Sequence, residues 1–166
     1  YVLSKDLGRK KRVRNDLAQR DVDVLIHAPD DPHELGSLLR SVWAFGWRRV
    51  FVSDPHGVWF TQDQKIVLDS RAAARRHKNP LAVLPSDQLD LGAYDYTLLC
   101  DGRREGTALS RLRLPPCHRM LLVYGCDTCT QGAEHIFVDQ TSAGIEPRFR
   151  HAGSIMLSVL AEMLEK

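Results

Sequence analysis

The sequence predicts a single α/β domain with a largely parallel sheet, and two observations predict it. Segments typical of strands alternate along the chain with segments typical of helices, and several of the strand segments are almost wholly apolar. Strands of that composition are usually buried on both faces, as they are in parallel sheets covered by helices. A chain of 166 residues has an ordinary length for one domain and can bury a substantial core.

The first part of the chain predicts a basic extension, followed by a strand, a helix and a second strand. Residues 1–21 are mostly polar and charged, with apolar residues spaced as in a short amphipathic helix. Residues 22–27 predict the first strand and residues 50–52 the second. Residues 33–45 predict the helix between them, and Gly46 ends it. The apolar residues of this helix recur at helical spacing: Leu35, Leu38, Leu39, Val42 and Trp43.

The remainder of the chain continues the alternation. We expect a helix over residues 63–74, a short helix or turn over residues 86–91, and connecting structure that can include a helix over residues 103–112. Further strands are expected over residues 81–84, 96–100, 120–124 and 136–138. A closing helix is expected from about residue 150 to residue 166. Residues 22–166 therefore form the domain that follows the basic extension.

The closing helix has a strongly apolar face. It consists of Ile155, Met156, Val159, Leu160 and Met163. A terminal helix that only covered solvent would expose less apolar surface than this. We therefore expect two chains to pair through this face.

The candidate ligand site lies at the ends of three strands. Ligands of open parallel α/β sheets bind beyond the carboxyl ends of the strands. The turns after Cys100, Tyr124 and Val138 are in this position. The sequence has no phosphate-cradling loop, no dinucleotide glycine fingerprint and no Gly-x-Ser-x-Gly elbow. These absences count against the common nucleotide-binding and hydrolase classes, although another α/β small-molecule enzyme stays an alternative.

The distribution of charge is more informative than its sum. Lys and Arg number 23 and Asp and Glu 21, so the net charge is only +2. The basic residues nevertheless gather in three clusters, and arginine forks match phosphate oxygens. We expect nucleic-acid contacts in the first two clusters, although solvated surfaces would give the same pattern. The three clusters are Arg9, Lys10, Lys11, Arg12 and Arg14; Arg71, Arg75, Arg76 and Lys78; and Arg103, Arg104, Arg111 and Arg113.

Four cysteines offer a weak indication of a metal site. They are Cys100, Cys117, Cys126 and Cys129. Cys126 and Cys129 have the spacing of zinc ligands, but no second pair matches them. A tetrahedral site would need Cys117 together with His118 or His135. We expect reduced thiols and no metal, as is usual in an intracellular protein.

No apolar run is long enough to cross a membrane, and no signal peptide is visible. The chain begins at Tyr1 rather than at methionine, as a fragment or a processed form does. We therefore expect an intracellular protein, with the cytoplasm, the nucleus and the mitochondrion all left open.

The most specific motif spans residues 31–52. A mainly apolar helix that contains Arg40 begins with Asp31-Pro32-His33 and Gly36, and it ends at Ala44-Phe45-Gly46. This order resembles the first motif of the SpoU/TrmH branch of the SPOUT RNA methyltransferases. Three later landmarks of that family follow in order: the small residues Ser70–Ala74, the strand 121–124 with Gly125-Cys126-Asp127, and the strand 136–138 with its loop 140–147 and terminal helix.

The resemblance implies a fold, a cofactor and a reaction. The fold is an α/β domain with a trefoil knot near the C-terminus, in which chains pair through their terminal helices as a homodimer or a heterodimer. Three loops of the knot hold S-adenosylmethionine, largely through backbone groups. The usual reaction methylates a ribose 2′-hydroxyl of transfer or ribosomal RNA. The resemblance places cofactor binding at Leu99, Cys100, Asp101, Gly102, Val123, Tyr124, Gly125, Val138 and Gln140.

Arg40 is the leading catalytic candidate. A ribose hydroxyl is a weak nucleophile and needs a proton acceptor or a cation that favours the alkoxide. The resemblance gives that role to the arginine of this helix, and a guanidinium can also hold the neighbouring phosphate. The alternative is an exposed helix arginine that is paired with Asp30, Asp31 or Glu34.

Three further motif positions depart from the family pattern. The asparagine of the first motif is Glu34, the glutamate of the second is Asp127, and the asparagine of the third is replaced by Phe149 or His151. Ionised glutamate only accepts hydrogen bonds, whereas His151 can accept a proton. We count Glu34, Asp127 and His151 with Arg40 as candidate catalytic residues. A second hypothesis is a homologue without catalysis that binds RNA or assists ribosome assembly, alone or in a heterodimer.

Overall fold

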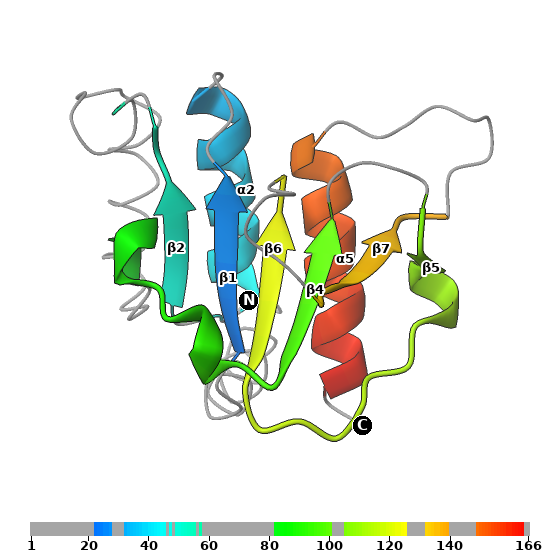
Figure 1. Ribbon diagram of the computed structural model, residues 1–166. Coiled ribbons are helices and arrows are strands. Elements are labelled where there is room, and N and C mark those ends of the chain that lie inside the picture. The colour runs from blue at the N-terminus through cyan, green and yellow to red at the C-terminus, as the bar shows by residue number, and fades with distance from the viewer. Residues whose placement is uncertain are drawn as a thin grey trace, which may run out of the picture.

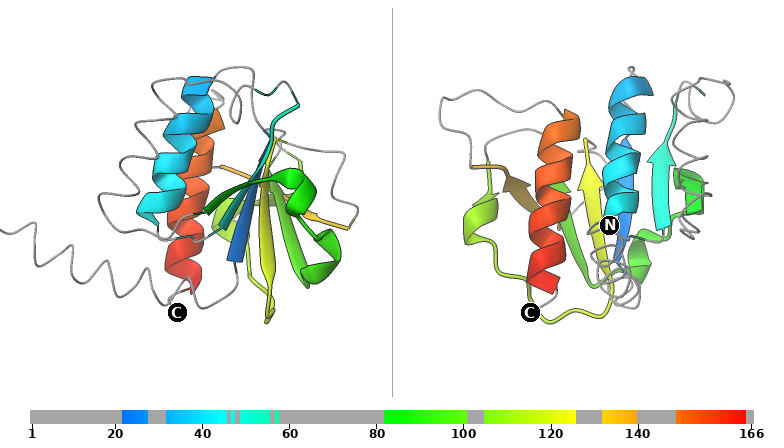
Figure 2. Two further views of the ribbon diagram at one scale, coloured as in Figure 1. Left: turned by 90° about the vertical axis from the view of Figure 1, so that its left-hand side faces the viewer. Right: turned by 180° about the vertical axis from the view of Figure 1, so that it is seen from behind.

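The domain is built on one parallel sheet with two helices side by side on one of its faces. The computed structural model describes residues 22–27, 32–45, 47, 49–55, 57, 82–100, 105–125, 132–139 and 149–164. The strands (Figure 1) are β1 (Val22–His27), β2 (Arg49–Ser53), β3 (Ala82–Pro85), β4 (Tyr96–Cys100), β5 (Thr107–Ala108), β6 (Met120–Tyr124) and β7 (Glu134–Phe137). The helices are α2 (Pro32–Ala44) and α5 (Phe149–Leu164), with short 3-10 helices η1 (Ser86–Gln88), η2 (Leu91–Ala93) and η3 (Leu109–Arg111). Figure 2 shows that α2 and α5 cover the same face of the sheet.

The strand order brings a late strand to the middle of the sheet. The order is β3-β2-β1-β6-β4-β7-β5, and every pair is parallel. β6 lies between β1 and β4, and all five of its residues are buried. Burial on both faces explains its unbroken apolar sequence, which predicted this strand correctly. The predicted α/β class and parallel sheet are therefore confirmed.

The expected elements match the structure with two exceptions. The strands expected over residues 22–27, 96–100 and 120–124 have the expected bounds, and β2, β3, α2 and α5 differ from their predicted bounds by one or two residues. β7 was placed two residues too late, because it opens on the polar residues Glu134 and His135. β5 was missed within the expected connecting structure, because two residues show no periodicity. The extension over residues 1–21 and the helix expected over residues 63–74 lie outside the described residues.

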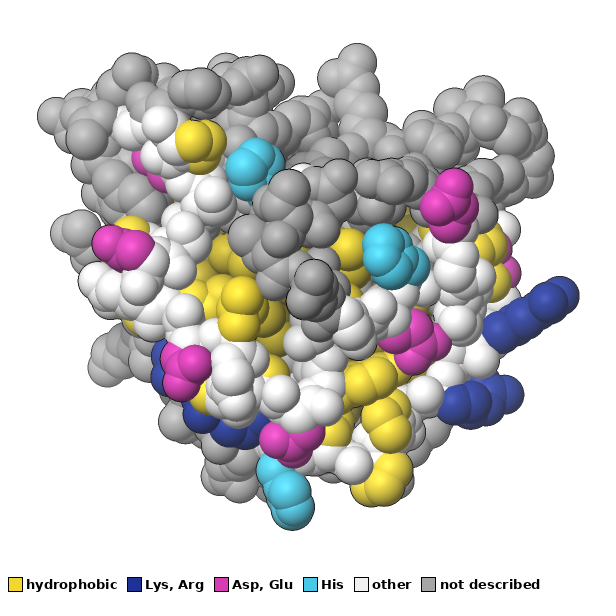
Figure 3. Space-filling model, in the orientation of Figure 1, with side chains coloured by type: hydrophobic (Ala, Val, Ile, Leu, Met, Phe, Trp, Pro, Cys, Tyr) yellow, Lys and Arg dark blue, Asp and Glu magenta, His cyan; other side chains and the backbone are white. Residues whose placement is uncertain are grey.

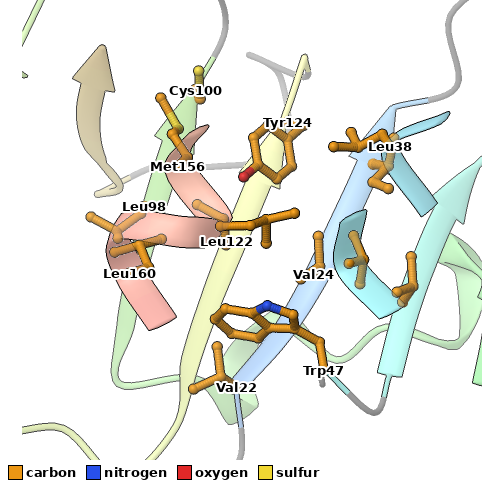
Figure 4. Close-up of a cluster of buried hydrophobic side chains, with 14 of the residues drawn as sticks. Val22, Val24, Leu38, Trp47, Leu98, Cys100, Leu122, Tyr124, Met156 and Leu160 are labelled. Carbon is orange, nitrogen blue, oxygen red and sulfur yellow. The ribbon is translucent and has the colours of Figure 1, made fainter. Parts of the chain in front are cut away.

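The core fills both faces of the sheet. On the helix side, side chains of α2 and α5 meet alternate residues of the strands, and Trp47 is 1% exposed (Figure 4). On the opposite face, a smaller cluster joins Leu25, Phe51, Leu99, Leu121 and Val123. Successive strand residues therefore enter different clusters, as the pleat requires. Among the described residues, no helix is long and apolar enough to span a membrane.

Gly153 lets α5 approach both α2 and β6 closely. A Cβ atom at this position would lie 2.5 Å from Leu38 Cδ1 and 3.4 Å from Tyr124 Cε1. The Tyr124 hydroxyl donates to the Gly153 carbonyl oxygen over 3.1 Å. One residue further, Ser41 Oγ and Ser154 Oγ share a hydrogen bond of 2.6 Å between the two helices. Figure 4 shows the Tyr124 ring between the side of α5 with Met156 and the side of α2 with Leu38.

The apolar face of α5 is covered mainly by residues of the same chain. Met156 and Leu160 are fully buried in its own core, and Ile155, Val159 and Met163 pack partly against that core. Met156 and Leu160 are therefore covered within the chain, and the pairing of two chains stays a prediction. The sequence pattern could not distinguish a helix that covers a sheet from one that pairs with a second copy.

We expect Gly153→Ala to destabilise the fold by about 1 kcal/mol or more, since overpacking costs about 1–3 kcal/mol and outweighs the gain in helix propensity. Chemical denaturation measures this free energy of unfolding. Ser158→Ala, on the exposed side of α5, is the matched control and should change it by less than about 0.5 kcal/mol. In a Leu38→Ala background the clash is absent, and Gly153→Ala should then cost nothing. An equal loss in both backgrounds would contradict the proposed contact.

Candidate active site

The three candidate ligand turns follow three adjacent strands. β6, β4 and β7 are neighbours in the sheet, with Cys100 opposite Tyr124 and Leu99 opposite His135. The Gly125 amide donates to the Cys100 carbonyl oxygen over 2.8 Å, which joins the first two turns directly. Gly125 has a φ of 79°, a conformation that strains residues with a side chain. The structure therefore brings together the described members of the predicted ligand site.

The side chains at these strand ends are buried in the core. Leu99 and Val123 are fully buried on one face of the sheet, whereas Cys100, Tyr124 and Val138 are buried on the helix side. Burial raises the pKa of the Tyr124 phenol well above its usual range, so that this hydroxyl stays a donor to Gly153. The described strand ends can therefore offer a ligand backbone N–H and C=O groups rather than these side chains. Such groups suit a polar ligand held by hydrogen bonds.

Arg40 and His151 lie on the two helices that are in contact. Both side chains are exposed. Arg40 directly precedes Ser41, and His151 lies about one turn before Ser154, so each is near the hydrogen bond between these serines. Gly153 ties the same part of the helix pair to Tyr124, the last residue of β6. A guanidinium and an imidazole are thus presented on the side of the sheet that α2 and α5 cover.

Other predicted site residues lie where the structure gives no side chain or no position. Glu34 belongs to the first turn of α2 and Phe149 opens α5, but their side chains lie outside the described part. Asp101, Gly102, Asp127 and Gln140 lie outside the described residues, as do Asp30 and Asp31. The first two basic clusters, residues 9–14 and 71–78, are also outside them, together with Arg103 and Arg104.

The described basic residues form no continuous patch on the face seen in Figure 3. There, hydrophobic side chains gather over the middle of the sheet, acidic and histidine side chains surround them, and Lys and Arg side chains lie at the margins. Arg111 and Arg113 of the third cluster are exposed beside η3. Among the residues of the three basic clusters, these two arginines are the ones that the structure describes.

No described group of residues could form a metal centre. The part of the chain that the structure describes contains no set of three His, Cys, Asp or Glu residues placed to hold an ion. Cys100 and Cys117 form no disulfide, and burial raises the pKa of the Cys117 thiol. Cys126 and Cys129, on which the zinc alternative depends, lie outside the described residues.

A buried carboxylate near the amino ends of the strands was missed by sequence reasoning. Asp23 in β1 is 2% exposed and is the one buried charged residue among those described. Arg49 donates to both of its carboxylate oxygens, over 2.9 and 2.6 Å, and the Tyr94 hydroxyl donates over 2.6 Å. The Arg119 guanidinium lies 5.2 Å from the centroid of the Tyr94 ring. The signal was a single aspartate inside an apolar strand, but its partners come from distant segments.

This network stabilises the fold and is separate from the candidate ligand turns. Asp23 is the second residue of β1 and Arg49 the first of β2, whereas the turns follow the last residues of their strands. Because all these strands are parallel, the two groups lie at opposite ends of the sheet. A buried charge without a partner would be costly, so Arg49 and Tyr94 hold Asp23 in place.

Neither the comparison with protein-family models nor that with curated proteins finds a match. Solved structures do match. A TrmH/SpoU tRNA modifying enzyme from A. aeolicus has a TM-score of 0.64 at 17% identity, over 99% of this chain and 85% of that one. The chain has the SpoU/TrmH fold.

Two further structures show the same fold. An AdoMet-bound rRNA methyltransferase from Sinorhizobium meliloti has a TM-score of 0.61 at 13% identity, over 86% of this chain and 56% of that chain. A SpoU methyltransferase from Streptomyces viridochromogenes, in complex with AdoMet, has a TM-score of 0.56 at 13% identity, over 84% and 59%. The chain therefore spans little more than half of these two proteins. The SpoU/TrmH fold implies the predicted trefoil knot. Residues 126–131, between β6 and β7, and residues 140–148, between β7 and α5, lie outside the described part.

The tyrosine environments predict a loss of stability at alkaline pH. Burial and the hydrogen bond to Asp23 raise the pKa of Tyr94, and burial and the hydrogen bond to Glu134 raise that of Tyr96. In the unfolded chain these phenols ionise near pH 10. Their contribution to folding is therefore complete below about pH 10 and is lost as the pH rises towards the folded-state values.

Tyr94→Phe should lower the free energy of unfolding at neutral pH by about 1 kcal/mol, since it removes a donor from a buried carboxylate. It should also flatten the fall in stability above about pH 10, because one raised phenol is gone. Urea denaturation at several pH values measures both effects. If native and variant chains lose stability with the same dependence on pH, Tyr94 does not contribute in this way.

Proposed function

We propose that the chain is a divergent SpoU/TrmH methyltransferase that transfers a methyl group from S-adenosylmethionine to RNA, at a ribose 2′-hydroxyl of transfer or ribosomal RNA. The observation that supports this most is the convergence of three turns, after β4, β6 and β7, in a fold shared with AdoMet-bound methyltransferases. We also propose RNA as the partner and pairing of two chains, as a homodimer or a heterodimer. The TM-scores test the fold, whereas the reaction rests on the site.

The described residues fit S-adenosylmethionine at this edge. The Gly125 position has no side chain to fill the space beside its turn, and its left-handed backbone suits glycine. The side chains of Leu99, Cys100, Val123 and Val138 are buried in the core, so a ligand at these strand ends would contact backbone groups. A ligand held by backbone groups tolerates changes of side chain at the same positions. The predicted cofactor residues Asp101, Gly102 and Gln140 continue these turns.

In this reaction the protein mainly has to position the cofactor and the ribose hydroxyl and to stabilise the charge that develops on the ribose oxygen. S-adenosylmethionine supplies a methyl group on a positively charged sulfur. As the ribose oxygen forms its bond to the methyl carbon, the bond from that carbon to sulfur breaks and its electron pair stays on sulfur. The hydroxyl must lose its proton in the same process. Arg40 would hold the neighbouring phosphate and favour the alkoxide, and the exposed imidazole of His151 would accept the proton.

A second candidate function is RNA binding without catalysis. Three motif positions favour it: Glu34 and Asp127 replace residues of the family pattern, and the third motif is replaced around Phe149 and His151. A carboxylate at Glu34 would also repel RNA phosphate if it lies close to it. In this function the chain would serve ribosome assembly, alone or with a partner chain that has the intact site.

Arg40→Ala should abolish methyl transfer while S-adenosylmethionine affinity stays nearly unchanged, because the cofactor turns lie on other elements. Loss of a group that acts on the transition state typically costs about 100-fold or more in rate. Arg40→Lys keeps the charge but loses the fork and should restore only part of the rate. Turnover measured with labelled cofactor, and affinity measured by calorimetry, separate these effects.

The same calorimetry separates the two candidate functions. Binding of S-adenosylmethionine with turnover supports the methyltransferase, whereas RNA binding without any cofactor heat supports the second function. Unchanged turnover in Arg40→Ala would remove this residue from the mechanism.

RNA affinity should fall steeply with salt, with a logarithmic slope of about −0.7 to −0.9 for each phosphate contact. Replacing Arg111 and Arg113 by alanine should reduce the slope by about 1 to 2 if both touch phosphates. Filter binding at several salt concentrations measures the slope, with the exposed Ser158→Ala as a control. RNA binding that does not depend on salt would exclude a phosphate-dominated interface.

A further inference from the structure

One of the three ligand turns is tied to the edge of the sheet by a carboxylate. Asp139, which directly follows Val138, accepts a hydrogen bond from the Ser110 amide over 3.2 Å at Oδ1. The Ser110 hydroxyl donates a second hydrogen bond to Oδ2 of the same carboxylate. Ser110 lies in η3, which follows β5 directly. Two donors of one residue therefore hold one side chain of the turn.

The residue that donates these bonds is itself firmly placed. Leu109 is 0% exposed and Leu112 is 1% exposed, so both ends of this segment are anchored in the core. Before them, Gly106 has a φ of 92°, and a Cβ atom there would lie 2.2 Å from the His135 carbonyl oxygen. β5 and η3 are therefore packed directly against β7 and cannot move away from it without disturbing the core.

The sheet alone does not hold the turn after β7. β7 pairs with β4 only at Glu134 and His135, and with β5 only at Ile136 and Phe137. Beyond Phe137 the ladder has ended. Ser110 is two residues after Ala108, and Asp139 is two residues after Phe137, so their hydrogen bonds extend the register Ala108↔Phe137 past the last strand pair.

We infer that Ser110 and Asp139 are positioning residues for the ligand turn at Val138, and that they hold it in the conformation that binds the cofactor. This inference rests on the proposed function, and it adds two residues that lie outside the motifs of the resemblance. The first ligand turn, after β4, leads along the chain into β5. Ser110 therefore follows the first turn along the chain and is hydrogen-bonded to Asp139 in the third turn. In this way the pair connects the two turns. Holding a binding loop in place in advance lowers the entropic cost of binding.

The charge on Asp139 favours this role. The hydrogen bond from the Ser110 hydroxyl lowers the pKa of the Asp139 carboxyl, with further contributions from the Ser110 amide and the Arg111 charge. The carboxylate is therefore ionised at neutral pH and accepts both bonds. Hydrogen bonds to an ionised acceptor are stronger than those between neutral groups.

The test compares Ser110→Ala with a matched variant at the other end of β7. Ser110→Ala removes the hydroxyl donor and keeps the amide, and it should weaken S-adenosylmethionine binding roughly tenfold. Tyr96→Phe removes the hydrogen bond from the Tyr96 hydroxyl to Glu134, the first residue of β7, and leaves the ligand turn untouched. Both variants lose one hydrogen bond from a hydroxyl to a carboxylate, at Glu134 in β7 for Tyr96→Phe and at Asp139 just beyond β7 for Ser110→Ala. Only the first should change the Kd measured by calorimetry.

Two further readouts separate positioning from general stability. Ser110→Thr retains a hydroxyl and should restore most of the affinity. Hydrogen exchange of the Val138 and Asp139 amides should become faster in Ser110→Ala and remain unchanged in Tyr96→Phe, even where the two lose similar thermal stability.

The possible failures are distinguishable. If the native chain binds S-adenosylmethionine and Ser110→Ala binds it equally well, the positioning role is wrong and the proposed function stands. An equal loss of affinity in both variants would also overturn the positioning role, because it would reflect stability alone. If the native chain does not bind S-adenosylmethionine at all, both the proposed function and this inference are overturned.

Discussion

The close approach of α5 to α2 and β6 at Gly153 is the contact on which the rest of this structure depends. Without a side chain at that position, α5 can lie against Leu38 of α2, and the Tyr124 hydroxyl of β6 donates to the Gly153 carbonyl oxygen. The hydroxyl needs this acceptor, because a buried donor without a partner is costly. A single glycine thus joins the closing helix to the central strand, although 29 positions separate the two residues.

This packing explains why the candidate site is one of backbone groups. The strand ends that converge there, at Cys100, Tyr124 and Val138, use their side chains to fill the core beneath α5. What they leave at the edge of the sheet is main chain, shaped by the left-handed turn at Gly125 and its hydrogen bond to Cys100. Arg40 and His151, the described side chains that would act on a substrate in the proposed function, lie on the helices. That proposal places cofactor binding and these two side chains on different elements of the fold.

Much of the fold could be predicted because it rests on local pattern. β6 is wholly apolar, β1 and β4 are mostly apolar, and α2 shows helical spacing that ends close to Gly46. What could not be predicted depends on contacts between distant segments. Asp23 accepts hydrogen bonds from Arg49 and Tyr94, which lie in other segments of the chain. β5 is likewise defined by its pairing with β7. The apolar face of α5 was predicted correctly as a face, but its partner is the sheet of the same chain.

The same distinction between local pattern and contacts of distant segments applies to the candidate site. The three turns could be predicted to follow parallel strands, because that rule needs only the strands themselves, whereas ligand binding at these turns stays a prediction. The hydrogen bonds from Ser110 to Asp139 were not visible, since they link a 3-10 helix of three residues to a turn 29 positions away. The residues that maintain the scaffold are therefore distinct from those that would perform the reaction. Gly153, Tyr124 and Leu38 can keep the fold whatever residue occupies position 40, so a chain can diverge to 11–17% identity with its fold intact. The proposed activity is therefore to be tested at Arg40 and at the turns, and not at these core contacts.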